Sequence, residues 1–131
     1  MDIEWGSGEA GKFITNVGMV TTKGADGYNI MACEWTHQLS YSPGIIAVSI
    51  HPKNMTAENI KTSKEFGVSI CSVGQNVASS VSGSHSGKEI DKIAVLKDLG
   101  FGFYKGKKID VWMVKDAALN VECKLTKEVE T

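Results

Sequence analysis

The side chains best placed to bind an anion lie between a short apolar segment and the helix expected to follow it. Residues 44–50, G-I-I-A-V-S-I, form an uncharged run of buried-strand length, which ends at His51-Pro52. Lys53, Asn54 and Thr56 then stand at the expected helix N-terminus. Free backbone N–H groups and the positive end of the helix dipole attract anions at such a junction. The sequence therefore predicts an anion site, although the same residues also suit a solvated helix start with an ordinary cap.

Other side chains capable of chemistry are scattered along the chain. His85 lies in the loop S-G-S-H-S-G, where a histidine can be functional or simply exposed. Glu34 could act as an acid or base, and Trp35 beside it suits either a core or a ligand-facing position. Cys33 is interpreted as a small buried residue rather than a redox centre. The histidines and cysteines show no metal-ligand spacing, so no metal site is predicted.

Composition and charge exclude several classes of protein. The 131 residues are 42% hydrophobic and 22% charged, with a formal net charge of −1, which differs from the basic surface of a nucleic-acid binder. No apolar run is long enough to cross a membrane, and no signal peptide is visible. Three separated cysteines favour reduced thiols in the cytoplasm. The sequence predicts one cytoplasmic domain over residues 1–131, with 1–11 as a flexible lead-in, that binds neither nucleic acid nor membrane.

Hydrophobic periodicity indicates how these residues are positioned. It predicts strands over residues 13–22, 28–34, 44–50, 65–73, 101–104, 109–114 and 119–125. It predicts helices over residues 54–63, 75–82 and 89–99, the second burying Val77 and Val81. Residues 24–27 suit a hairpin turn, residues 35–43 an irregular segment or single helical turn, and residues 82–87 a loop. Strands outnumber helices and no βαβ spacing recurs, which favours a mostly antiparallel barrel decorated by helices.

Five ordered segments carry a family resemblance. They are V-G-M-V-T-T (17–22), N-I-M-A-C-E-W (29–35), S-Y-S-P-G-I-I-A-V-S-I (40–50), K-N-M-T-A-E-N-I (53–60) and S-G-S-H-S-G…D-K (82–92). Together they resemble the flavin reductase-like, FMN-binding split-barrel family, which includes flavoredoxin-like proteins. The resemblance implies a mainly β fold with short helices, an antiparallel Greek-key split β-barrel. Family members usually continue past the position of Thr131 with another strand, so the chain is expected to lack the usual C-terminal strand.

The resemblance also implies a cofactor site. The segment 31–36 would run along the isoalloxazine ring and ribityl chain, partly through its backbone. The phosphate would lie at the strand end 49–51 and the helix start, and the loop 82–86 would lie near the flavin or the nicotinamide. The residues implied to bind FMN are Met31, Ala32, Cys33, Glu34, Trp35, Thr36, Ser49, Ile50, His51, Lys53, Asn54, Thr56, Ser82, Gly83 and His85. FMN itself would carry the chemistry, with His85 the one candidate for a catalytic side chain.

The activity that follows from the resemblance is an FMN-dependent oxidoreductase of the flavin reductase type. Electrons would pass from NADH or NADPH through FMN to free flavin or another acceptor, within a homodimer that holds FMN at its interface. One alternative keeps the FMN in an electron-transfer protein with a redox protein partner, or in a ferric reductase. Another is a cofactor-free binding or assembly module that retains only the fold.

Overall fold

Four antiparallel strands form the sheet that positions the site, in the order β2-β1-β5-β8. The computed structural model describes residues 2–4, 6–12 and 15–131. The strands are β1 (Gly18–Gly24), β2 (Gly27–Cys33), β3 (Thr36–Tyr41), β4 (Gly44–Val48), β5 (Glu65–Ile70), β6 (Phe103–Lys105), β7 (Trp112–Val114) and β8 (Leu119–Lys124). The helices are η1 (Ala10–Lys12), a 3-10 turn, and α1 (Met55–Ser63), α2 (Asn76–Ser84) and α3 (Lys92–Asp98). The strands β3 and β4 form one hairpin, and β6 and β7 another.

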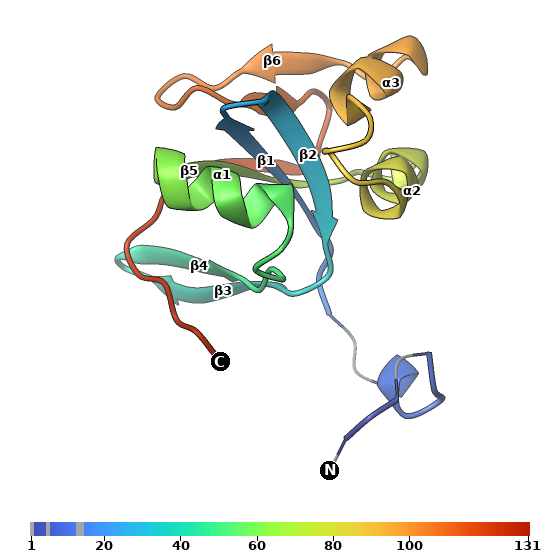
Figure 1. Cartoon of the computed structure of the whole chain (residues 1–131), viewed down its shortest axis with the longest axis vertical. Helices are drawn as coiled ribbons and strands as arrows, with labels where there is room; N and C mark the ends of the chain where they lie inside the picture. The colour runs from blue at the N-terminus through green and yellow to red at the C-terminus, as the bar shows by residue number, and fades with distance from the viewer. Residues whose placement is uncertain (1, 5, 13–14) are drawn as a thin grey trace.

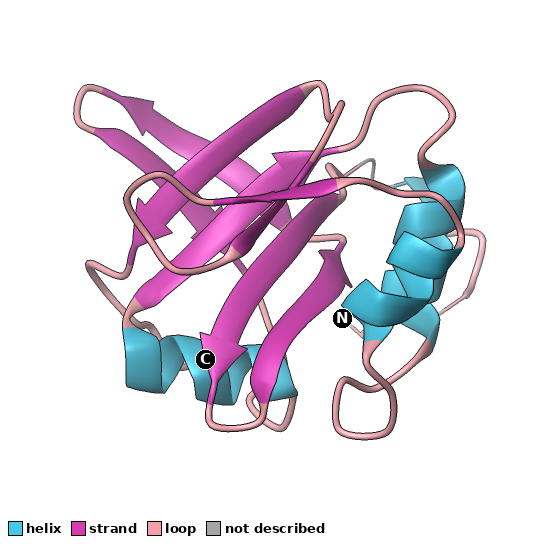
Figure 2. Ribbon diagram, turned by 90° about the horizontal axis from the view of Figure 1, so that it is seen from above, coloured by secondary structure: helices cyan, strands magenta, loops and turns pink. Residues whose placement is uncertain are grey.

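The helices cover the sheet from two sides, as Figures 1 and 2 show. Helix α1 packs across β1, whereas α2 and α3 pack against β2. One apolar cluster lies under α2 and α3 and contains Met19, Ile30 and Leu96. A second lies on the other side of β1 and contains Val20, Ile60 and Phe66. Because neighbouring residues of β1 point to opposite faces, this strand contributes to both clusters and is buried over most of its length.

Several sequence-based expectations are confirmed. Gly24 pairs with Gly27 across the tight turn between β1 and β2, and Gly27 takes the positive φ of 100° that glycine tolerates. The helix expected over 54–63 is α1, which buries Ile60. The strand expected over 13–22 is observed as β1, which begins at Gly18; positions 13 and 14 lie outside the described residues.

The expectation for residues 35–43 is wrong. Thr36–Tyr41 is strand β3, and it pairs with β4 through a turn at Ser42 and Pro43, with a bulge near Leu39. The residues of β3 are mostly polar and exposed, so no alternation of apolar residues marks it as a strand. The strand expected over 44–50 is confirmed as β4, but its expected burial is wrong, because β4 is exposed or half-buried along its length.

Residues 75–90 depart from the predicted pattern as well. Helix α2 continues to Ser84, so it includes the first three residues of the predicted loop 82–87. It buries Ala78 and Ser82, whereas Val77 is 48% exposed; Val81 does pack against the core. The next helix begins at Lys92 rather than at position 89, because Asp91 caps it by accepting the Ala94 N–H at 3.0 Å.

Strand β8 forms one edge of the four-stranded sheet. It runs antiparallel to β5, its one strand partner in the described part of the chain. The period-two pattern of residues 119–125 therefore predicts the strand correctly. Its inner residues are half-buried on both faces, because Cys123 packs against the core while Glu122 accepts the N–H groups of Lys108 and Ile109.

The N-terminal residues 2–4 and 6–12 are largely exposed and lie away from the sheets in Figure 1. They belong to the stretch expected as a flexible lead-in, and its mobility stays a prediction. None of the described helices is long and apolar enough to cross a membrane.

A polar cluster joins the hairpin of β1 and β2 to the β6–β7 segment. The Asp110 carboxylate accepts hydrogen bonds from Lys23 Nζ at 2.6 Å and from the Tyr28 hydroxyl at 2.8 Å. It also forms an ion pair with Lys105. These donors, Lys105 first, hold the pKa of the Asp110 carboxyl well below its ordinary value of 3.8.

We expect Asp110→Asn to destabilise the protein at neutral pH, because the substitution removes the carboxylate that the cluster shares. A carboxyl with a lowered folded-state pKa contributes stability above its unfolded pKa, and that contribution is lost as the pH falls. Urea unfolding should therefore show a difference between wild type and variant that shrinks below about pH 4. A difference independent of pH would contradict this role for Asp110.

Candidate functional site

A polar pocket of about 320 Å³ lies where α1 begins, between strand β2 and the segment that links α2 to α3. Its lining residues are Asn29, Met31, Ala32, Lys53, Asn54, Met55, Thr56, Ser82, Gly83, Ser84, His85, Ser86, Gly87 and Lys92. These residues include two lysines and no carboxylate, so the pocket carries a positive formal charge. We call it the anion pocket.

The start of α1 is held in place by local hydrogen bonds. His51 accepts the Lys53 N–H at its Nδ1 (3.2 Å) and the Asn54 N–H at its carbonyl (3.0 Å). Asn54 is extended, with φ −72° and ψ 142°, as is usual for a residue that precedes a helix. Its side chain makes no capping hydrogen bond, so it does not occupy the N–H groups of the first turn. An anion at this helix end would be stabilised by those donors.

The base of the anion pocket is fixed by a buried hydrogen bond between β2 and α1. Asn29 Nδ2 donates to Thr56 Oγ1 at 3.0 Å, and Thr56 is only 1% exposed. Gly87 packs against the same amide so closely that a Cβ on it would lie 2.3 Å from Asn29 Oδ1 and 2.9 Å from Met55 Sδ. The position of the start of α1 relative to β2 is therefore set by contacts among β2, α1 and the segment after α2.

Lys92, the first residue of α3, is the unusual group of the pocket. It is only 4% exposed, and its Nζ donates to the Ser82 carbonyl at 3.0 Å, the one hydrogen bond of this amine in the described structure. Burial lowers its pKa to about 8, from an ordinary 10.5. The Ser82 hydroxyl is buried and has no hydrogen-bond partner among the described residues. An ammonium with unused donors beside a free hydroxyl suits an anionic oxygen ligand such as phosphate.

The structure brings eight of the fifteen predicted site residues to this pocket. They are Met31, Ala32, Lys53, Asn54, Thr56, Ser82, Gly83 and His85. They come from β2, the start of α1 and the end of α2, which are far apart in sequence but converge in space. His85 is exposed and lines the pocket, and a catalytic function for it stays a prediction.

A second group of predicted residues lies where β2 passes into β3. The Trp35 carbonyl accepts the Ser49 N–H at 3.0 Å, and the Cys33 thiol donates to the Ser49 carbonyl at 3.4 Å. Thr36 donates from its hydroxyl to the Cys33 carbonyl at 3.0 Å, while Glu34 is exposed. These contacts join the end of β4 to the end of β2, outside the anion pocket, and a cofactor contact for this group stays a prediction.

Two predicted residues have structural roles. Ile50 packs against the apolar cluster that contains Val20 and Phe66. His51 is exposed and organises the backbone before α1 through its ring and carbonyl. Within the described residues, no group of three or more histidine, cysteine, aspartate or glutamate side chains could hold a metal ion.

The sequence-based list of site residues missed six that line the pocket: Asn29, Met55, Ser84, Ser86, Gly87 and Lys92. Lys92 ends the segment 82–92 that carried the family resemblance, and this was the one available signal for it. Nothing in the periodicity of the sequence marks it as buried, because a lysine is exposed by default.

Comparison with models of known protein families shows which family the chain belongs to. A family model described as the flavin reductase like domain matches residues 10–131. The chain belongs to the flavin reductase-like domain family.

Two relatives, each described as an uncharacterized protein, match most of the chain. A protein of Pyrococcus abyssi is 31% identical over 107 residues, which cover 82% of this chain and 59% of the relative. A protein of Archaeoglobus fulgidus is 31% identical over 108 residues, with the same coverage of both chains. The flavin reductase-like chain thus spans about three fifths of the length of the curated relatives that it matches.

Solved structures agree with this assignment. Flavoredoxin of Desulfovibrio vulgaris (Miyazaki F) superposes with a TM-score of 0.80 at 28% identity, covering 99% of this chain and 69% of that one. An FMN-binding protein from Thermus thermophilus superposes with a TM-score of 0.81 at 23% identity, covering 97% and 67% of the two chains, and so supports the fold. These matches confirm the predicted family and the mainly β, antiparallel split-barrel fold with short helices.

Proposed function

We propose that this chain is the FMN-binding part of an oxidoreductase of the flavin reductase type. In this proposal electrons pass from NADH or NADPH through FMN to free flavin or another acceptor. The observation that carries the proposal is the anion pocket at the start of α1, which contains the buried Lys92 ammonium and the Ser82 hydroxyl that has no partner among the described residues. These groups fit the terminal phosphate of a flavin mononucleotide.

In this proposal, different residues of the anion pocket supply different groups that bind the phosphate. Lys92 supplies the buried positive charge, Ser82 a hydroxyl, and the first turn of α1 its backbone N–H groups. Lys53 adds a second, exposed positive charge at the rim. The Asn29–Thr56 hydrogen bond holds the helix start against β2 and so fixes one side of the pocket.

The chemistry of electron transfer is supplied by the FMN when it is bound. The chain contributes the surroundings of the ring. Residues 31–36 extend from the anion pocket to the point where β2 passes into β3, and this is the segment proposed to lie along the ring. No proton-transferring side chain is required for hydride transfer to a flavin, so the absence of an acid–base triad among the predicted residues is consistent with the proposal.

A second copy of the chain is part of the proposal. The hairpin of β3 and β4 exposes large apolar side chains, with Leu39 at 65% and Tyr41 at 89% exposure. Trp35, at the base of this hairpin, is also exposed and neighbours the predicted ring site. Apolar surface of this kind favours association, which supports a homodimer with FMN at its interface.

A flavin-containing electron-transfer protein is the second candidate, and one observation favours it. The solved flavoredoxin matches this chain over nearly its whole length at 28% identity. In that case the bound flavin would exchange electrons with a protein partner rather than with a nicotinamide nucleotide.

An absorbance experiment tests these proposals. The protein is soaked with FMN, desalted, and then treated anaerobically with NADH or NADPH; riboflavin, which lacks the phosphate, is the matched control ligand. We expect FMN bands that persist after desalting, riboflavin bands that do not, and bleaching by a nicotinamide nucleotide. Retained FMN that only dithionite bleaches would favour the electron-transfer protein. Loss of FMN on desalting, together with no binding in solution, would overturn both, and light scattering on the loaded sample tests the dimer.

A further inference from the structure

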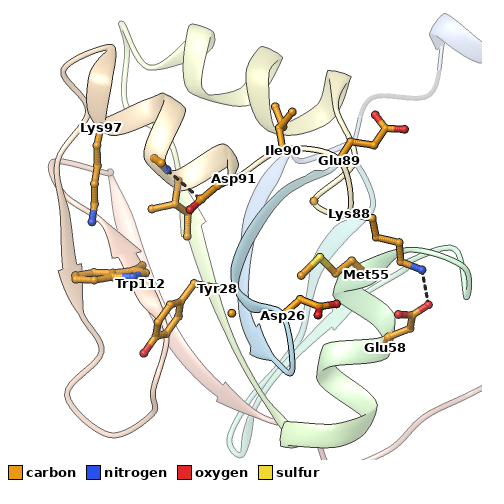
Figure 3. Close-up of a pocket in the computed structure, with 14 residues that line it drawn as sticks. Asp26, Tyr28, Met55, Glu58, Lys88, Glu89, Ile90, Asp91, Lys97 and Trp112 are labelled. Atoms are coloured by element: carbon orange, nitrogen blue, oxygen red, sulfur yellow. Dashed lines mark hydrogen bonds and ion pairs between the residues drawn. The ribbon is translucent and has the colours of Figure 1, made fainter.

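A second cavity, open and larger, adjoins the anion pocket. It measures about 960 Å³ and lies between β2, α1, α3 and β7, as Figure 3 shows. Met55 and Gly87 line both cavities, so these two residues lie at the boundary between them. We call it the acidic groove, for the charge of the side chains that line it.

The charge of the groove is opposite to that of the anion pocket. Its lining holds four carboxylates and two ammonium groups: Asp26, Glu58, Glu89, Asp91, Lys88 and Lys97. Both lysines are already engaged, because Lys88 pairs with Glu58 and Lys97 lies 4.2 Å from the centre of the Trp112 ring. The formal charge of the groove is therefore negative, whereas that of the pocket is positive.

An ion pair lies on the groove side of the boundary between the two cavities. Lys88 Nζ lies 2.7 Å from Glu58 Oε1, which joins the segment after α2 to helix α1 beside Met55 (Figure 3). Beneath this pair, Gly87 has no room for a Cβ against Asn29 and Met55. The wall between pocket and groove is thus closely packed and carries a carboxylate on its groove side.

We propose that this wall and the acidic groove make the site selective for a flavin mononucleotide over a flavin dinucleotide, with Glu58 as a specificity-determining residue. The inference rests on the proposed function, because it takes the FMN phosphate to occupy the anion pocket. A dinucleotide carries a second phosphate bonded to the first, which must leave the pocket. In the groove that phosphate meets carboxylates and no free ammonium, and like charges at short range repel. Selectivity of this kind arises from repulsion of the wrong ligand.

Titration of the whole chain with FMN and with FAD, followed by flavin fluorescence, tests the proposal. Wild type should bind FMN more tightly than FAD, and Glu58→Gln should reduce this preference about tenfold, chiefly by tightening FAD. Glu58 is about half exposed, so the variant is expected to fold. Asp98→Asn, the same loss of charge at the end of α3 and outside both cavities, is the matched control and should leave the ratio unchanged. Added salt should also weaken the preference of wild type, since the repulsion is screened.

The outcomes separate this inference from the proposed function. If wild type binds FMN and FAD with equal affinity, the selectivity is overturned and the proposed function stands. The same holds if Glu58→Gln leaves the ratio of the FMN and FAD affinities unchanged. A change in the ratio of the same size in Asp98→Asn also overturns it, because the effect would then not depend on the groove. Failure of wild type to bind either flavin overturns the proposed function and the selectivity together.

Discussion

Replacing Lys92 by methionine is expected to weaken FMN binding about a hundredfold, while making the unloaded protein more stable. The loss of affinity follows because Lys92 supplies the buried positive charge of the anion pocket, and its ammonium donates one hydrogen bond among the described residues, to the Ser82 carbonyl, so it has donors left for a ligand. Methionine fills a similar volume without charge. Fluorescence titration measures the affinity, and urea unfolding of the unloaded protein measures the stability.

The gain in stability has a separate physical cause. Burial lowers the Lys92 pKa from 10.5 to about 8, which corresponds to a cost on the order of 3 kcal/mol for keeping the charged form buried. Loss of the hydrogen bond to the Ser82 carbonyl offsets part of this gain, so a net increase of about 2 kcal/mol is expected at neutral pH. A residue with a purely structural role would instead destabilise the protein when truncated.

The pH dependence distinguishes the two effects. Between pH 8 and 10.5 the unfolded chain holds more protons on Lys92 than the folded chain does, so the stability of wild type rises with pH across this window. The difference between Lys92→Met and wild type should be fully present below about pH 8 and should vanish above 10.5. The affinity of wild type for FMN should fall as the pH rises above about 8, because the ammonium is then lost.

Lys97→Met provides the control on the same helix. Lys97 lies over the Trp112 ring and outside the anion pocket, so its replacement should leave FMN affinity unchanged. Equal losses of affinity in Lys92→Met and Lys97→Met would show that general charge, rather than the buried ammonium, attracts the phosphate.

The part of the site that sequence could predict is its local part. His51-Pro52 follows an apolar strand, and Asn54 immediately precedes helix α1. These few residues are enough to predict where the helix begins and which polar side chains stand at its N-terminus. The turn at residues 24–27 is local in the same sense, because two glycines and an aspartate fix it. Where one short segment determines the backbone, the chemistry placed on it can be inferred without knowing the fold.

The part that sequence could not predict depends on distant contacts. Lys92 is buried only because α2 extends to Ser84 and brings the Ser82 carbonyl to its ammonium, and neither fact has a local pattern. The strand β4 shows the reverse case: its apolar run predicts burial, yet its one strand partner among the described residues is the polar strand β3. An apolar sequence whose face is exposed favours a contact with another surface, which the proposed dimer provides.

Gly87→Ala is the second substitution with a large expected effect. A Cβ at this position would lie 2.3 Å from Asn29 Oδ1 and 2.9 Å from Met55 Sδ, so the Asn29 side chain has to move away from Thr56. We expect a loss of about 2 kcal/mol in stability and about a tenfold loss of FMN affinity, because the start of α1 shifts with it. Urea unfolding and FMN titration measure both.

Gly83→Ala is the matched control for this substitution. Gly83 lines the same pocket, but its nearest neighbour, the Ala32 Cβ, is 3.4 Å from a built Cβ, which is an ordinary contact. Because Gly83 is in α2, alanine should stabilise the helix by about 0.5–1 kcal/mol and leave FMN binding intact. A loss of affinity as large as that of Gly87→Ala would contradict the assignment of the effect to the crowded wall.

The cause of the Gly87→Ala defect can be isolated by combining it with Asn29→Ala. The second change removes the amide that a Cβ would strike, at the cost of the hydrogen bond to Thr56. If the clash with Asn29 is the cause, the double variant should be no less stable than Asn29→Ala alone, so the two effects are strongly non-additive. Additive losses would place the strain at Met55 instead, since its sulfur, 2.9 Å from the built Cβ, remains when the Asn29 amide is removed. In either case the coupling measures how tightly β2, α1 and the segment after α2 are held together around the anion pocket.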